Sequence, residues 1–104
     1  MITKAKSKAM RQLEKLGGGA LALGGFIEAI RLGEEESQVA FSKRLKVSKS
    51  HLCDIEKDRK VVSPGRAAEF AKRLGYSEAQ FVRLALQGEV ERAGLALRVH
   101  VEVA

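Results

Sequence analysis

The spacing of apolar residues through the middle of the chain predicts a series of short helices. Phe26, Ile27 and Ile30 fall on one side of a first helix, which should end near Gly33. Farther on, apolar residues recur three and four positions apart, so each later helix also has one inward face. The inward-facing residues of the later helices are Phe41, Leu45, Leu52, Ile55, Ala67, Phe70, Ala71, Leu74, Phe81, Val82, Ala85 and Leu86. We therefore expect five helices packed around one core.

A serine precedes each of the four later helices. Its side chain can accept a hydrogen bond from a backbone amide that the first helical turn leaves unpaired. The capping serines are Ser37, Ser48, Ser63 and Ser77. Pro64 at a first helical position and Gly75 after the last apolar residue also mark the bounds of the fourth helix.

The last ten residues follow a different period. In "LALRVHVEV", apolar residues alternate with Ala, Arg, His and Glu, which is typical of a half-buried β-strand. A lone strand leaves its backbone groups unpaired, so it needs either the N-terminal segment or the same strand of a second copy as its partner. We favour the second copy. The residues expected to form this dimer contact are Leu97, Val99, Val101 and Val103.

Glycines divide the chain near its beginning. The stretch "LGGGALALGG" separates a basic N-terminal segment from the helical region, which gives an appendage at 1–25, a helical domain at 26–93 and a terminal strand at 94–104. The appendage could be a solvated tail, an arm that follows DNA phosphates, or a segment that orders on a partner. The sequence does not choose among these alternatives.

Composition narrows the function classes. A net charge of +6 and a pI near 9.8 favour polyanionic partners, nucleic acid first. Cys53 has no second cysteine to pair with, and the two histidines show no zinc-ligand spacing. No apolar run is long enough for a membrane span and no leader is evident, so we expect a cytoplasmic protein without metal or cofactor. Phosphate-binding loops, serine elbows and zinc-protease motifs are also absent, so we expect no enzyme.

The densest cluster of basic residues lies in "SQVAFSKRLKVSKSHLCDIEKDRK", residues 37–60. Its pattern predicts a helix, a three-residue turn and a second helix that share one core. On the second helix, a small polar stripe lies opposite Leu52 and Ile55, with Lys49 in the exposed first turn. The stripe contains Ser50, Cys53, Asp54 and Lys57. Such a narrow polar face suits insertion into the major groove of DNA.

This segment resembles the helix-turn-helix domains of the Cro and cI phage repressors, also called the XRE family. The positions that carry the resemblance are Ser37-Gln38, Leu45, Val47-Ser48, Leu52 and Ile55-Glu56. The likeness extends over about residues 26–86. It implies an all-α, five-helix, lambda-repressor-like fold, to which the C-terminal β-strand would be appended.

The resemblance implies roles for individual residues. Lys49, Ser50 and Asp54 fall where the family reads bases, and His51 flanks them as a weaker candidate. Gln38 would bond a backbone phosphate from a helix start. The other residues expected to neutralise phosphates are Lys43, Lys57, Arg59 and Lys60. Arg31 and Glu56 match a family ion pair that would tie the first helix to the reading helix.

Three positions depart from the family pattern. Lys46 stands where the turn usually has Gly, and must tolerate a left-handed backbone at a cost of about 1 kcal/mol. Asp58 also replaces a Gly, and Asp tolerates that conformation better than most residues. Ser42 replaces an Ala, and its hydroxyl can bond back to a helix carbonyl. Cys53 on the outer face could sense oxidation, although a small inert thiol is the simpler interpretation.

The expected function is a sequence-specific, DNA-binding transcriptional repressor of bacterial or phage type. It would act as a homodimer on a near-palindromic operator, with reading helices about 34 Å apart. The resemblance also covers autoregulating antitoxins of toxin-antitoxin operons, whose partner is a cognate toxin. The alternative is a protein-interaction module on the same scaffold that does not bind DNA specifically.

Overall fold

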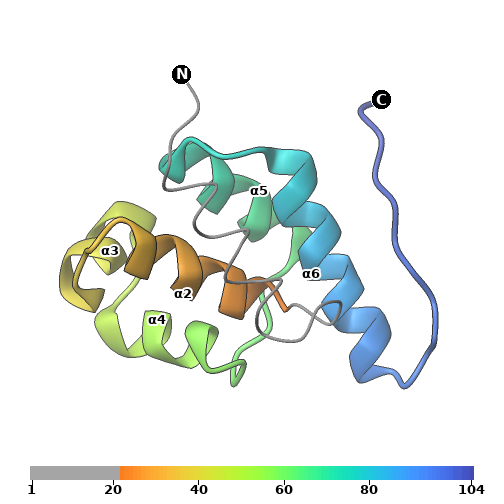
Figure 1. The fold of residues 1–104 in the computed structure, drawn as a ribbon, viewed down its shortest axis with the longest axis horizontal. Coiled ribbons are helices and arrows are strands. Elements are labelled where there is room, and N and C mark those ends of the chain that lie inside the picture. The colour runs from red at the N-terminus through yellow and green to blue at the C-terminus, as the bar shows by residue number, and fades with distance from the viewer. Residues whose placement is uncertain (1–21) are drawn as a thin grey trace.

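The computed structural model describes residues 22–104, and the regular elements of this part of the chain are all helices, which agrees with the predicted all-α class (Figure 1). The alternatives for the N-terminal appendage concern residues that lie outside this range, apart from 22–25. The described helices are α2 (Leu23–Gly33), α3 (Gln38–Leu45), α4 (Lys49–Glu56), α5 (Pro64–Leu74) and α6 (Glu78–Arg92). None of these helices is long and apolar enough to cross a membrane.

The four predicted serine caps are confirmed. Each hydroxyl accepts a hydrogen bond from the backbone amide three residues later, at 3.0–3.2 Å. The pairs are Ser37 with Ala40, Ser48 with His51, Ser63 with Arg66, and Ser77 with Gln80. A local rule therefore fixes where α3, α4, α5 and α6 begin.

Each described helix is followed, one or two residues after its last residue, by a residue in the left-handed conformation. The next residue's amide then bonds back to a carbonyl of the last turn, as Val47 does to Ser42 at 3.0 Å. Gly75 and Gly94 adopt this conformation at no steric cost. The other three such residues are not glycines: Glu35, Lys46 and Asp58. Lys46 and Asp58 therefore adopt the conformation that their positions predicted.

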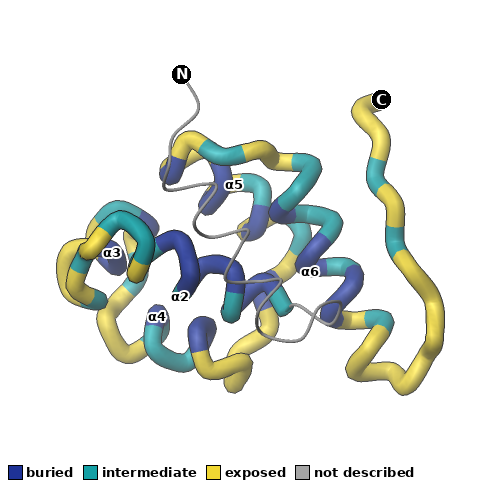
Figure 2. Tube along the Cα trace, in the orientation of Figure 1, coloured by how far each residue is buried: buried dark blue, intermediate teal, exposed yellow. Residues whose placement is uncertain are grey.

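Helix α2 occupies the centre of the fold, where it packs against α4 and α6 (Figure 1). Phe26, Ile27 and Ile30 are fully or almost fully buried there. The Phe26 ring meets Tyr76 and Phe81 edge-on, with ring centroids 6.3 and 5.7 Å away. The buried stretches of all the helices turn toward this shared core (Figure 2).

Helix α2 begins at Leu23, three residues before the predicted first helix. Leu23 and Gly24 are buried, so the helical body includes residues 23–25, which the sequence analysis placed in the appendage. A Cβ at Gly24 would lie 2.0 Å from the carbonyl oxygen of Ile55. The absence of a side chain at Gly24 therefore lets α2 approach the last turn of α4.

The predicted C-terminal strand does not form in this single chain. Residues 95–104 run back along α6 without ladder pairing to any described residue, and most of them are exposed (Figures 1 and 2). The Leu95 amide donates to the Val90 carbonyl at 3.2 Å. Farther along, Gln87 holds the segment, because its amide nitrogen donates to the Leu97 carbonyl at 2.9 Å. Its oxygen accepts from the Val99 amide at 2.7 Å. The alternating pattern thus yields an extended segment, because a strand needs a second strand to pair with.

Candidate nucleic-acid interface

The candidate site is the outer face of α4 together with the turn that joins it to α3. Lys46 starts this turn in the left-handed conformation, and Val47 packs against the core. Leu52 and Ile55 then anchor the inner face of α4 with at most 1% of their surface exposed. Because the inner face is buried in the core, the orientation of α4 and of its outer face is fixed.

The predicted base-reading residues lie on this outer face, and their side chains differ in how much surface they expose. Lys49 and Ser50 are exposed in the first turn, while His51 and Asp54 are partly buried. The part of the chain that the structure describes does not cover Lys49 or Ser50. The face is therefore open where a groove-reading helix needs to be open.

Arg59 lies over the second turn of this face rather than beside it. Its Nε donates to Asp54 Oδ1 at 3.0 Å, and its Nη2 lies 3.7 Å from Cys53 Sγ. The left-handed Asp58 causes this placement, because it lets the Arg59 amide bond back to the Asp54 carbonyl at 2.8 Å. The bond to Asp54 raises the pKa of Arg59. Asp54, expected among the base-reading residues, is thus bonded to Arg59 in the structure.

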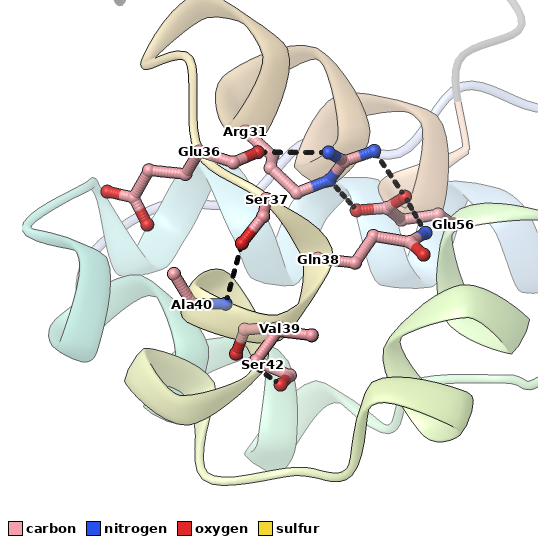
Figure 3. Close-up of polar contacts among 8 residues, drawn as sticks. All are labelled: Arg31, Glu36, Ser37, Gln38, Val39, Ala40, Ser42 and Glu56. Atoms are coloured by element: carbon pink, nitrogen blue, oxygen red, sulfur yellow. Dashed lines mark hydrogen bonds and ion pairs between the residues drawn. The ribbon is translucent and has the colours of Figure 1, made fainter.

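Glu56 is the centre of a buried polar cluster that joins three helices (Figure 3). Its side chain has no exposed surface. Arg31 donates to it twice, from Nε at 2.7 Å and from Nη2 at 3.1 Å, and Gln38 Nε2 donates at 3.0 Å. The bond to Glu56 is the main cause of a raised pKa for Arg31, which keeps the guanidinium charged.

This cluster fixes the orientation of α4. A buried carboxylate with three donors loses little by burial, whereas removal of one donor would leave a charge without compensation. Arg31 also donates from Nη1 to the Glu36 carbonyl at 3.0 Å, which holds the segment leading into α3. Gln38, expected to bond a phosphate, also has this structural role, which the sequence analysis missed.

A second ion-pair network was not anticipated. Arg44 on α3 bonds both Glu34 and Glu36, and its guanidinium lies 5.2 Å from the centre of the Phe41 ring. The bond to Glu34 is the main cause of the raised pKa of Arg44. The acidic run at 34–36, ten and eight residues before Arg44, was the available signal. Arg44 is therefore engaged within the fold, unlike its basic neighbours.

Three of the predicted phosphate-binding residues are available at the surface. Lys43, Lys57 and Lys60 are exposed, and none of them forms an ion pair within residues 22–104. The Ser42 hydroxyl beside Lys43 is buried and donates to the Val39 carbonyl at 2.8 Å, as its position predicted. The positive charges of these lysines therefore have no ion-pair partner in the described part of the chain.

The described residues form no candidate metal site. They contain no group of three or more His, Cys, Asp or Glu side chains that could hold a metal ion. Cys53 is a free, partly exposed thiol beside Arg59. No protein-family model, curated protein or solved structure matches this chain.

Proposed function

We propose that the chain is a sequence-specific DNA-binding repressor of the Cro and cI type, with α3 and α4 as its helix-turn-helix. The observation that carries the proposal is the outer face of α4, exposed at Lys49 and Ser50 and held by the buried Arg31–Glu56 pair. A reading helix needs this combination, since base contacts require an open face and a fixed direction.

In the proposed complex the first turn of α4 enters the major groove. Lys49 donates to guanine O6 or N7, and Ser50 either donates or accepts. Arg59 takes part in reading as well, because Asp54 holds its Nε and leaves other guanidinium donors to meet a base edge. His51 is at the flank of the contact.

Phosphate contacts position the complex. The exposed Lys43, Lys57 and Lys60 neutralise the DNA backbone on either side of the groove. The second N–H of the Gln38 amide donates to a phosphate while the first stays with Glu56, so one side chain couples DNA contact to the buried cluster. These contacts supply affinity without sequence preference.

The proposed active form is a homodimer on a near-palindromic operator. One copy presents too small a reading surface for strong specificity, and two copies place α4 in successive major grooves. The exposed C-terminal segment, with Leu97 and Val103 61% and 90% exposed, supports a contact between copies. Within this class, we place the chain among the autoregulating antitoxins, because it carries segments on both sides of the proposed reading domain.

The test is DNA selection followed by fluorescence anisotropy. Fragments that the full chain binds are selected from a random library and sequenced, and the affinity of the best site is measured. The double variant Lys49→Ala/Ser50→Ala should bind that site at least about 100-fold more weakly, at 1–3 kcal/mol per lost base contact.

Lys72→Ala is the matched control, because it removes the same charge from α5, which lies across the molecule from α4 (Figure 1). Its affinity for the selected site should stay near that of the wild type. Unchanged binding by the Lys49→Ala/Ser50→Ala variant would remove α4 as the reading helix.

A second candidate function is a protein-interaction module that neutralises or scaffolds a partner. The apolar exposure of the C-terminal segment is the observation that favours it. If selection enriches no DNA sequence and the chain instead forms a stable complex with the protein encoded beside its gene, this alternative replaces the repressor.

A further inference from the structure

The C-terminal sequence is symmetric about one residue. Counting outward from His100, Val99 matches Val101, Arg98 matches Glu102, and Leu97 matches Val103. When two copies of a strand pair antiparallel about one residue, positions equally far from it lie opposite each other. That register sets Arg98 of each copy against Glu102 of the other and apolar residues against apolar residues.

The body of the protein holds this segment with one backbone edge turned inward. Gln87 is 8% exposed, and its amide bonds the Leu97 carbonyl and the Val99 amide. In an extended chain these two groups point to the same side, and those of Arg98 point to the opposite side. The inner edge therefore belongs to residues 97 and 99, and the outer edge to residues 98, 100 and 102.

The outer edge carries the backbone groups that the symmetric register needs. An antiparallel pair centred on His100 joins 98 to 102 and 100 to 100 through their own N–H and C=O groups. These are the groups that the bond to Gln87 leaves facing away from α6. Two independent features, the sequence symmetry and the side taken by Gln87, thus select the same pairing.

The described residues leave most of the segment exposed, with Val99 and Val101 partly buried. A cleft of about 440 Å³ lies between α6 and residues 95–98, and Leu95 and Leu97 remain half or more exposed. An apolar segment held away from the body, with a free edge, has the features of a strand that lacks its partner.

We propose that a second copy of this chain pairs with the outer edge of residues 97–103, antiparallel and centred on His100. Two cross-strand Arg98–Glu102 pairs and the apolar pairs 97–103 and 99–101 specify the register. The proposal deepens the dimer of the proposed repressor by naming its contact. Self-association is measured without DNA, so either proposal can fail alone.

Charge exchange tests the register. Sedimentation equilibrium of the full chain should show a reversible dimer at micromolar concentrations. Arg98→Glu and Glu102→Arg each place like charges opposite one another twice per dimer, and each should weaken association on the order of tenfold. The double variant Arg98→Glu/Glu102→Arg restores opposite charges, so its association should return to within about threefold of the wild type.

Cross-linking gives a second measurement that does not depend on affinity. In a Cys53→Ser background, His100→Cys places the thiols of two copies on Cα atoms about 5.5 Å apart, within disulfide range. Arg98→Cys and Glu102→Cys would each lie about 13 Å along the strand from their own copy. Under mild oxidation the first variant should form dimers at least about tenfold faster than the other two.

Three results would overturn the proposal: a chain that stays monomeric at about 100 μM, a double variant that associates as weakly as the single ones, or equal cross-linking at the three positions. If the natural occupant of this edge is another protein and not a second copy, the purified chain should stay monomeric. A dimer with the expected register that selects no DNA would refute the repressor and leave this contact intact.

Discussion

At the scale of single residues, the ends of the helices carry an unusual amount of strain. Glu35, Lys46 and Asp58 all adopt a left-handed backbone that side chains normally disfavour. Each lets the following amide close the last turn, and Lys46 and Asp58 flank α4 on its two sides. The strain is therefore concentrated around the proposed reading helix, where it sets the direction of the chain.

Replacing Lys46 by glycine should stabilise the fold. Glycine adopts φ near 61° without the steric cost of a side chain, so Lys46→Gly should raise the free energy of unfolding by about 0.5–1 kcal/mol. Urea denaturation at equal ionic strength measures the change. Lys43→Gly is the control, since it removes the same charge but places glycine inside α3, and should lower stability by about 1 kcal/mol. Similar losses in both variants would show that Lys46 is unstrained.

The sequence predicts such local features well and longer side-chain contacts less well. Serine caps and the left-handed Lys46 follow from rules that involve four or five neighbouring residues. The Arg59 contact with Asp54 depends on how the turn at Asp58 redirects the chain. The sequence pattern does not contain this information, so it predicted that Arg59 contacts a phosphate and that Asp54 contacts a base. The pattern likewise predicted Gln38 at the start of a helix, where it lies, but did not predict its bond to Glu56.

At the scale of elements, one glycine sets the distance between α2 and α4. The sequence has a run of glycines there, which the pattern placed at the boundary between the appendage and the helical domain. In the structure Gly24 faces the Ile55 carbonyl at close range, whereas a Cβ at Gly25 would meet nothing within 4 Å. Adjacent, identical residues therefore differ completely in role, which periodicity alone does not reveal.

Alanine at these two positions should have opposite effects. Gly24→Ala forces a backbone shift between α2 and α4 and should destabilise the fold by about 2–3 kcal/mol. Gly25→Ala fills open space in a helix and should stabilise it by about 0.5–1 kcal/mol. Thermal unfolding of the two variants beside the wild type measures both. If Gly24→Ala matched Gly25→Ala in stability, the close approach of the two helices would be refuted.

The C-terminal segment shows a limit of predicting secondary structure from the local sequence pattern. Alternation from Leu95 to Val103 correctly indicates an extended backbone with one apolar side, but a ladder is a property of two strands. Among residues 22–104, the Leu97 carbonyl and the Val99 amide bond to a side chain, that of Gln87, and not to a second strand. Nothing in the local pattern of α6 marks Gln87 for this role, since it is one polar residue in an otherwise mixed helix.

At the scale of the whole molecule, the excess of positive charge has a defined distribution. Several basic residues are neutralised within the fold, among them Arg31 and Arg44. Lys43, Lys57 and Lys60, around α4, have no ion-pair partner among residues 22–104. The net charge of the chain does not distinguish the basic residues that form ion pairs from those that do not. The remaining positive field therefore belongs in part to the face proposed to meet DNA.

This distribution predicts the salt dependence of DNA binding. Each neutralised phosphate contributes about 0.9 to the slope of log affinity against log salt concentration. In the proposed complex each lysine acts once per copy, so Lys57→Ala should lower the slope by about 1.8, and Lys57→Ala/Lys60→Ala by about 3.6. Sequence preference should stay unchanged, because phosphate contacts do not distinguish bases.

Anisotropy titrations of the selected site between about 50 and 200 mM salt give these slopes. Lys72→Ala on α5 should leave the slope at the wild-type value, which separates local contact from loss of overall charge. A drop of about 0.9 per lysine instead of 1.8 would mean that one copy binds the site, and would contradict the dimer. An unchanged slope in the double variant would place both lysines away from the phosphates, and α4 would then have to approach DNA by another side.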